Sequence, residues 1–381
     1  MCTPAVPVKR LARDVLNAPV PREQWKNQNG KFWIEGDTTM MTRTSVSSLV
    51  KWPVWLLFAC VAVVLVRSGE VAAQVVATPP QLDKNQAGFY RLKVGRVELT
   101  ALSDGTMTWD ALGQLTNISP AAARRLLDAS FLKSPIVAAV NAYLIQLGGR
   151  LLLVDAGTGD TLGPILFKLP NSLKAIGYTP DQITDILVTH IHPDHTGGLT
   201  VGGKKVYPNA TVHMDRRELA YWTDHAAMEA AEGPTKRFFG SVEPTLGPYV
   251  ASGSVKTFAG ETQLFPGLRA VPAYGHTPGQ VSYHLEDDGE KMIFWGDIIH
   301  VPAIQFANPN ATITFDVDSK AAARQRKKDF EDAAKNRTLV AMPHMYFPGV
   351  GHVAKERDGY RWIPIPYVDD ASRSSASNQG K

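Results

Sequence analysis

The chain has 381 residues, of which 44% are hydrophobic and 20% are charged, a composition typical of a globular protein with a sizeable core. Its formal net charge of +4 arises in residues 1–74, which hold nine Lys and Arg against five Asp and Glu. Residues 75–381 then hold 31 against 31 and carry no net charge. This balance argues against nucleic acid as a partner. Both cysteines, Cys2 and Cys60, precede residue 75, which excludes a disulfide framework, a thiolate metal ligand and a cysteine nucleophile from the rest of the chain.

The N-terminal part has the layout of a secretory signal peptide. Residues 1–39 show no sustained hydrophobic period and are expected to be unstructured, as in a chain whose start is placed too far upstream. Residues 40–73 contain basic residues, an uncharged stretch over 53–66 and a small-residue cleavage pattern. A membrane anchor is the alternative, but this stretch is short against the ~20 residues that span a bilayer. We therefore expect a periplasmic or secreted protein with no stable membrane anchor after cleavage.

The remaining chain divides into a linker over residues 74–88, a folded domain over 89–368 and a disordered tail over 369–381. Alternating or apolar runs predict strands, and capped amphipathic runs predict helices. The expected strands are two within 89–102, a hairpin over 140–154, and single strands over 183–188, 205–213, 268–272, 281–285, 291–295 and 339–341. The expected helices are 120–127, 216–225 and 321–335, the last with a solvated Lys/Arg face, and 226–250 is expected to be a loop-rich insertion. This interleaving indicates an α/β fold.

One short segment carries the chemistry. His190, His192, Asp194 and His195 fall within six residues, directly after an apolar run that predicts a buried strand. Pro193 and the glycines that follow place these side chains on a turn, where they can splay around two centres. Three imidazoles and a carboxylate so close together would repel one another or bind protons unless a cation lay between them. The segment therefore predicts a metal site, whereas a solvated His-rich loop is the simpler alternative.

The His-x-His-x-Asp-His motif resembles the signature of the metallo-β-lactamase-fold hydrolases, and the resemblance extends over about residues 90–365. It implies an αββα sandwich with two divalent metal ions, zinc or otherwise manganese, iron or cobalt, at one edge of the two sheets. It assigns His190, His192 and His276 to one ion, and Asp194, His195 and His344 to the other, with Asp297 bridging both. His352 competes with His344 for the last position. Asp155, at the end of the 140–154 hairpin, is implied to orient a ligand, although it can equally be a turn carboxylate.

Two such ions would share a water, lower its pKa and supply a metal-bridging hydroxide as the nucleophile. Asp194 and Asp297 are the candidate catalytic residues, Asp194 because it can also take the proton and pass it to the leaving group. The sequence contains no Gly-x-Ser-x-Gly elbow, which is consistent with a reaction that needs no protein nucleophile. The chain is therefore expected to be a metal-dependent hydrolase.

Within the family, the chain looks most like the methyl parathion hydrolase and periplasmic lactonase group. The residues that carry this resemblance are the predicted signal peptide and the stretches 140–145, 295–300 and 347–352. The group implies a small neutral ester-type substrate, such as an organophosphate triester, a lactone or an aryl ester, and a homodimer. Trp222, Phe239, His300 and Phe315 are candidate pocket residues, since aromatic side chains would hold an aryl group; core packing is the alternative for each.

Other readings of the same motif are a β-lactamase, a glyoxalase-like thioesterase, a nuclease and a non-catalytic metal-binding protein. His195 argues against a β-lactamase, in which another residue usually follows the His-x-His-x-Asp motif. The chain is too short to show the C-terminal helical domain of the thioesterases. A nuclease would need a basic surface. An intact ligand set makes a non-catalytic role the least favoured of these.

Overall fold

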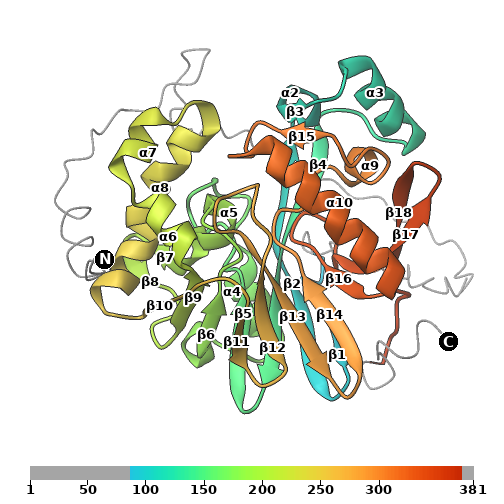
Figure 1. Cartoon of the computed structure of the whole chain (residues 1–381). Coiled ribbons are helices and arrows are strands. Elements are labelled where there is room, and N and C mark those ends of the chain that lie inside the picture. The colour runs from blue at the N-terminus through green and yellow to red at the C-terminus, as the bar shows by residue number, and fades with distance from the viewer. Residues whose placement is uncertain (1–85, 371–381) are drawn as a thin grey trace, which may run out of the picture. The chain divides into compact units, whose positions relative to one another are not determined.

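The structure is a computed structural model that describes residues 86–370 (Figure 1). The predicted signal peptide, both cysteines and the tail beyond residue 370 lie outside the described residues. Among the described residues, no helix is both long and apolar enough to cross a membrane.

Two seven-stranded sheets form the framework. The first has the order β1 (Phe89–Val94), β2 (Val97–Trp109), β4 (Ile136–Leu147), β5 (Arg150–Val154), β6 (Asp185–Leu187), β9 (Thr211–Asp215) and β10 (Val255–Phe258). The second has the order β11 (Thr262–Phe265), β12 (Leu268–Pro272), β13 (Val281–Asp287), β14 (Glu290–Phe294), β16 (Leu339–Ala341), β17 (Val350–Glu356) and β18 (Gly359–Pro364). Two short pairs, β3 (Leu115–Thr116) with β15 (Thr312–Ile313) and β7 (Thr200–Val201) with β8 (Lys204–Lys205), lie apart from them.

The sheets pack face to face because successive side chains of each strand point to opposite faces. In β4, Ile145 joins the cluster between the sheets, whereas Leu144 joins the cluster under the helices of the first sheet. In β14, Phe294 points between the sheets and Ile293 points to the outer face of the second sheet. The central strands therefore bury both faces, which explains why β4 and β5 are nearly continuous apolar runs.

Helices cover the two outer faces. On the first sheet these are α4 (Leu169–Ala175), α6 (Arg216–Trp222) and α8 (Gly233–Ala251), and on the second sheet α10 (Ser319–Asn336) (Figure 1). The remaining helices are α2 (Ala111–Gln114), α3 (Pro120–Ala129), η1 (Pro180–Gln182), α5 (Pro193–Thr196), η2 (Gly197–Leu199), α7 (His225–Ala230) and α9 (Pro302–Gln305). The expected αββα sandwich is confirmed.

Three local predictions are wrong. The expected strand over 205–213 is broken between β8 and β9, where Pro208 has no N–H to donate to a strand ladder. The helix expected over 216–225 ends at Trp222. The expected loop over 226–250 is instead α7 and α8, and α8 continues through Pro244 and Pro248. The apolar residues of α8 recur on one face, and their burial against the first sheet outweighs the cost of the prolines.

The solvated basic face expected for α10 has one exception. The Arg326 side chain is fully buried, and its guanidinium donates hydrogen bonds to the carbonyl oxygens of Ile298, Pro309 and Ala311. Arg326 thus ties α10 to the segment that follows Asp297, so that this helix helps to hold the loops of the second sheet.

Candidate metal centre

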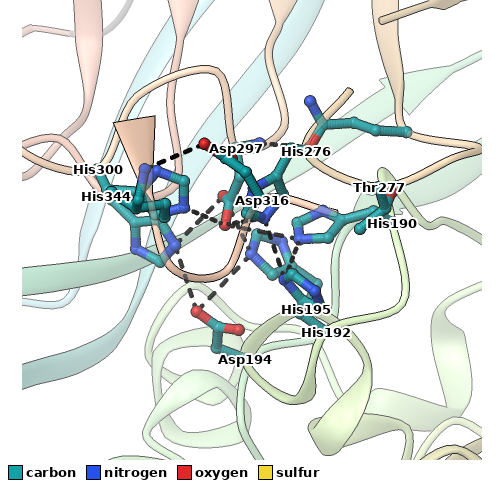
Figure 2. A network of polar contacts seen from close by, with 12 residues as sticks. His190, His192, Asp194, His195, His276, Thr277, Asp297, His300, Asp316 and His344 are labelled. Atoms are coloured by element: carbon teal, nitrogen blue, oxygen red, sulfur yellow. Dashed lines mark hydrogen bonds and ion pairs between the residues drawn. The ribbon is translucent and has the colours of Figure 1, made fainter. Parts of the chain in front are cut away.

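The predicted ligands follow strands of both sheets. In the second sheet, β12 is antiparallel to β13, β13 is antiparallel to β14, and β14 is parallel to β16, so that β12, β14 and β16 run in one direction. His276, Asp297 and His344 come shortly after the ends of these three strands. In the first sheet, β6 leads into the segment with His190 and His192. Four segments that are distant in sequence thus meet in one cluster, and Figure 2 shows their side chains pointing toward one another.

The first group consists of His190, His192, His276 and Asp297, all buried. The Nε2 of His190 lies 3.0 Å from the Nδ1 of His192, and the Nε2 of His276 lies 3.1 Å from that same Nδ1. The Oδ2 of Asp297 lies 3.5 Å from the Nε2 of His190 and 3.4 Å from that of His276. Three ring nitrogens and one carboxylate oxygen thus converge on one point.

The second group consists of Asp194, His195, His344 and again Asp297. The Nε2 of His344 lies 3.2 Å from the Oδ2 of Asp194 and 3.2 Å from the Oδ1 of Asp297. The Nε2 of His195 lies 3.2 Å from that Oδ1 as well. Asp297 therefore turns one carboxylate oxygen to each group, an arrangement that a bridging ligand requires.

Oxygen atoms hold the ring nitrogens that point away from the two groups. The Nδ1 of His195 lies 2.7 Å from the Oδ2 of Asp155, that of His276 lies 2.8 Å from the Oδ1 of Asp316, and that of His344 lies 2.9 Å from the carbonyl of Ala139. Each of these oxygens accepts a hydrogen bond, so that Nδ1 keeps a proton and Nε2 is the nitrogen that faces inward and is left to bind a cation. This is the usual arrangement behind metal-ligating histidines.

The electrostatics of the groups depend on the balance between burial and carboxylate charge. Burial lowers the pKa of His190 to about 3, and the charge of His195 adds to this effect. Burial also opposes protonation of His276, but Asp297 and Asp316 outweigh it and raise the pKa of His276 to about 9. In the same way Asp297 and Asp194 overcome burial and raise the pKa of His344 to about 10. Without a cation, these three carboxylates therefore favour the protonated forms of His276 and His344.

The donor set fits divalent cations. Imidazole nitrogen and carboxylate oxygen together suit zinc, manganese, iron or cobalt. The Nε2 of His195 and the Oδ1 of Asp297 are buried and make no hydrogen bond, although they face each other. A buried polar atom without a partner is costly, and a cation between these two atoms would satisfy both. The two groups are therefore suited to hold two ions that share Asp297.

The structure brings together all seven side chains that the sequence singled out as ligands. It places His344 in the second group, whereas the competing His352 lies on β17 and belongs to neither group. Asp155 lies where a ligand-orienting residue would be, with the backbone N–H and the hydroxyl of Thr189 as its further donors. His213, by contrast, pairs with Asp185 away from the cluster, at 2.8 Å.

The four candidate pocket residues lie in different surroundings. His300 contacts the cluster, with its Nε2 at 2.8 Å from the Oδ2 of Asp297, and burial lowers its pKa to about 4. Trp222 is buried, and the centroid of its ring lies 5.3 Å from that of His192. Phe315 is half-buried, and the centroid of its ring lies 6.5 Å from that of the His300 ring. Phe239 packs inside the core, with its ring 4.7 Å from that of Trp222.

Several neighbours of the cluster were not anticipated from the sequence. Phe238 rather than Phe239 has its ring next to His192, at 4.6 Å, and also lies 5.9 Å from Phe315. Trp109 lies 6.0 Å from Phe315. Asp316 orients His276, and Glu218 bonds to the loops of the first group. For Phe238 the sequence held one signal that was outweighed by the prolines and glycines around it: the apolar residues of 239–249 recur at helical spacing, which is typical of a helix such as α8.

The chain is similar to a family of known proteins that includes hydrolases. Residues 136–344 match the model of the metallo-beta-lactamase superfamily. An N-acyl homoserine lactonase from Bacillus sp is 25% identical over 248 residues, which cover 58% of this chain and 90% of the lactonase.

Among solved structures, the hydrolase AbOPH of the beta lactamase superfamily is 33% identical, with a TM-score of 0.71, over 75% of this chain and all of that one. AidC, a dizinc quorum-quenching lactonase in complex with a homoserine product, is 27% identical, with a TM-score of 0.69, over 74% of this chain and 99% of its own. The family match spans more than half of the chain and includes all seven clustered residues. The chain therefore belongs to the metallo-beta-lactamase superfamily of hydrolases and has lactonases among its homologues.

Proposed function

We propose that the protein is a di-metal hydrolase that opens lactones, with aryl esters and organophosphate triesters as further substrates of the same site. The observation that carries this proposal is the position of Asp297, which turns one oxygen toward each of two His/Asp groups. The proposed ligands are His190, His192 and His276 for one ion, Asp194, His195 and His344 for the other, and Asp297 for both.

When bound, the two ions would supply an activated water and polarise the oxygen of the substrate that gains charge. The side chains of the chain do the rest. Asp194 is the most exposed of the seven ligands, with 15% of its side chain accessible, and is therefore placed to accept a proton and pass it to the leaving oxygen. Asp155, Asp316 and the carbonyl of Ala139 keep their histidines in the ligating tautomer.

The surroundings favour an uncharged substrate with an apolar or aryl part. Trp109, Phe238 and Phe315 form a series of aromatic rings beside His192 and His300, and aromatic rings bind apolar groups through their area. The lactonases among the homologues support a lactone. The same rings suit an aryl leaving group, which supports membership of the methyl parathion hydrolase group as the second candidate.

Three further properties belong to this proposal. The two ions are zinc, a choice supported by the similarity of this chain to the dizinc lactonase AidC, and metal analysis of the purified protein tests this. The chain is exported after cleavage near residue 73, which N-terminal sequencing of the mature protein tests. The mature protein, from residue 74 onward, is a homodimer, which light scattering coupled to gel filtration tests.

The decisive experiment compares substrates. Zinc-loaded protein is assayed for kcat/KM with an aryl lactone, a dimethyl aryl phosphotriester, an acyl thioester and a cephalosporin. A preference for the lactone supports the proposal, and a preference for the phosphotriester supports the second candidate. Faster turnover of the cephalosporin or the thioester would instead indicate a β-lactamase or a thioesterase.

A control variant tests whether the reaction uses the cluster. Asp297→Asn removes the charge shared by the two groups and should abolish hydrolysis of every substrate while the protein remains folded by circular dichroism. Unchanged turnover in this variant would rule out a di-metal reaction.

A further inference from the structure

Glu218 is a buried carboxylate that the proposed reaction does not use. It lies in α6, and its side chain is fully buried. A carboxylate is costly to bury unless hydrogen bonds or a counter-charge compensate it. Four donors compensate Glu218, and all four belong to neutral groups. Such a group needs an explanation, because an apolar side chain would fill the same space without this cost.

The four donors come from the segments that form the first group. The Oε1 of Glu218 accepts a hydrogen bond from the backbone N–H of Ile191, at 2.8 Å, and from the Nε1 of Trp222, at 2.7 Å. Its Oε2 accepts one from the hydroxyl of Thr277, at 2.7 Å, and from the backbone N–H of Gly279, at 2.8 Å. Ile191 stands between His190 and His192, and Thr277 directly follows His276.

The loop after His276 also packs directly on the backbone of α6. A Cβ atom at Gly279 would lie 2.2 Å from the backbone nitrogen of Glu218, so only glycine allows this approach. The contact between α6 and this loop is therefore built into both segments. Because the backbones meet, a shift of α6 would displace the loop.

Glu218 thus connects two loops of different sheets, next to the backbone hydrogen bond from the N–H of Val281 to the carbonyl of Thr189, which joins the same two segments. His190 and His192 follow β6 of the first sheet, whereas His276 follows β12 of the second sheet. Their ring nitrogens must nevertheless meet at about 3 Å from one another, as they do around the Nδ1 of His192. One carboxylate with an oxygen for each loop fixes the distance between the two loops.

We propose that Glu218 is a positioning residue that holds the His190–His192 loop and the His276 loop at the spacing that a cation in the first group requires. Through Trp222 it also fixes the aromatic ring that lies against His192. This inference rests on the proposed function, since it assumes that the first group binds a metal ion.

The test uses Glu218→Gln and measures binding of Zn²⁺ to the metal-free protein by competition with a chromophoric chelator. Gln keeps the size of the side chain but offers an acceptor to one loop only, because its NH₂ group faces the donors of the other. We expect the affinity for one of two Zn²⁺ ions to fall by about 10- to 100-fold, the range usual for residues behind a metal ligand. The affinity for the other ion should change little.

Two further variants separate this role from a general effect on folding. Thr277→Val removes one donor without touching the carboxylate and should weaken the same Zn²⁺ ion by about 2- to 10-fold. Glu331→Gln, an exposed carboxylate on α10, should leave both affinities unchanged. Thermal unfolding of each metal-free variant is measured in parallel.

The outcomes are distinct. If the unchanged protein binds no Zn²⁺, the proposed function fails. If it binds two ions and Glu218→Gln binds both equally well, Glu218 is only a structural residue and the inference is wrong, whatever the melting temperature. If Glu218→Gln does not fold, Thr277→Val decides: weaker binding of one ion supports the inference, and unchanged binding overturns it.

Discussion

Asp155→Asn is the sharpest test of how the second group is held. Asp155 has a φ of +58°, a left-handed conformation that Asn tolerates as well as any residue with a side chain, so the substitution adds no backbone strain. The Oδ1 of Asp155 accepts from the N–H of Thr189, and its Oδ2 accepts from the Thr189 hydroxyl and from His195. Asn can keep an oxygen toward the Thr189 N–H only by turning its NH₂ group toward His195.

His195 must then accept at Nδ1 and carry its proton on Nε2, the nitrogen that faces Asp194 and Asp297. That tautomer cannot ligate a cation through Nε2. A hydrogen bond to a charged group contributes about 1.5–3 kcal/mol, and about 1.4 kcal/mol corresponds to a tenfold change in affinity. We therefore expect Asp155→Asn to bind one Zn²⁺ ion about 10- to 100-fold more weakly, in agreement with the usual effect of such residues.

The assay is a Zn²⁺ titration against a chelator, with kcat/KM for a lactone measured at limiting and at excess Zn²⁺. Excess Zn²⁺ should restore part of the lost activity, because the defect lies in affinity. Asp160→Asn, an exposed carboxylate a few residues further along the chain, is the matched control. If Asp155→Asn bound two ions with the affinity of the unchanged protein, the tautomer argument would be refuted, and Asp155 would be an ordinary turn carboxylate.

Three other predictions concern Asp316, the protonation of His276 and His344, and the buried Asp329 of α10. Asp316→Asn, which changes the partner of His276, should weaken the ion that Glu218→Gln weakens and not the one that Asp155→Asn weakens; loss of the same ion in all three variants would contradict the two-group assignment. The pKa values of His276 and His344 are raised to about 9 and about 10, so Zn²⁺ must displace a proton from each at pH 7. Titration calorimetry in buffers of different ionisation enthalpy should therefore show that Zn²⁺ binding releases protons, and the affinity for Zn²⁺ should rise with pH. Burial raises the pKa of Asp329 to about 7, against 3.8 for a free side chain, so between these pH values the folded state binds a proton that the unfolded state does not, and stability falls as the pH rises. In urea unfolding, Asp329→Asn should therefore raise the free energy of unfolding by up to about 4 kcal/mol at pH 8 and by almost nothing at pH 4.

The parts of the fold that the sequence predicted are those in which local pattern and burial agree. The strand β12 has the predicted bounds, and the helix α3 begins at Pro120 behind its Ser119 cap, as the pattern indicated. The helix α8 was missed because its prolines and glycines are local signals for a loop, and the apolar face that overrides them gains its energy only against the first sheet. Propensity alone could not reveal that contact.

The same distinction applies to the candidate site. The clustering of the seven candidate ligands was predictable because four of them fall within six residues and the others stand in short motifs with Gly or Pro after strands. The residues that hold the ligands lack such motifs. Asp316 contacts a histidine 40 residues away, and Glu218 contacts residues 27 and 59 positions away. A single Asp or Glu in a helix or loop carries no mark of such a contact until the fold places it.

The residues behind the candidate ligands explain how side chains from two sheets can be held in fixed positions relative to one another. Each histidine has one ring nitrogen in the cluster, and Asp155, Asp316 and the carbonyl of Ala139 hold the other nitrogen in three of them from three separate segments. In the metal-free protein the carboxylates keep protons on His276 and His344, so the geometry is held by charge even before a cation arrives. A divalent ion would then replace protons at positions that the outer partners already define, so we expect binding to need little rearrangement of the loops. We therefore expect the residues behind the ligands to contribute to the affinity of the site for metal, by the 10- to 100-fold that is usual for such residues.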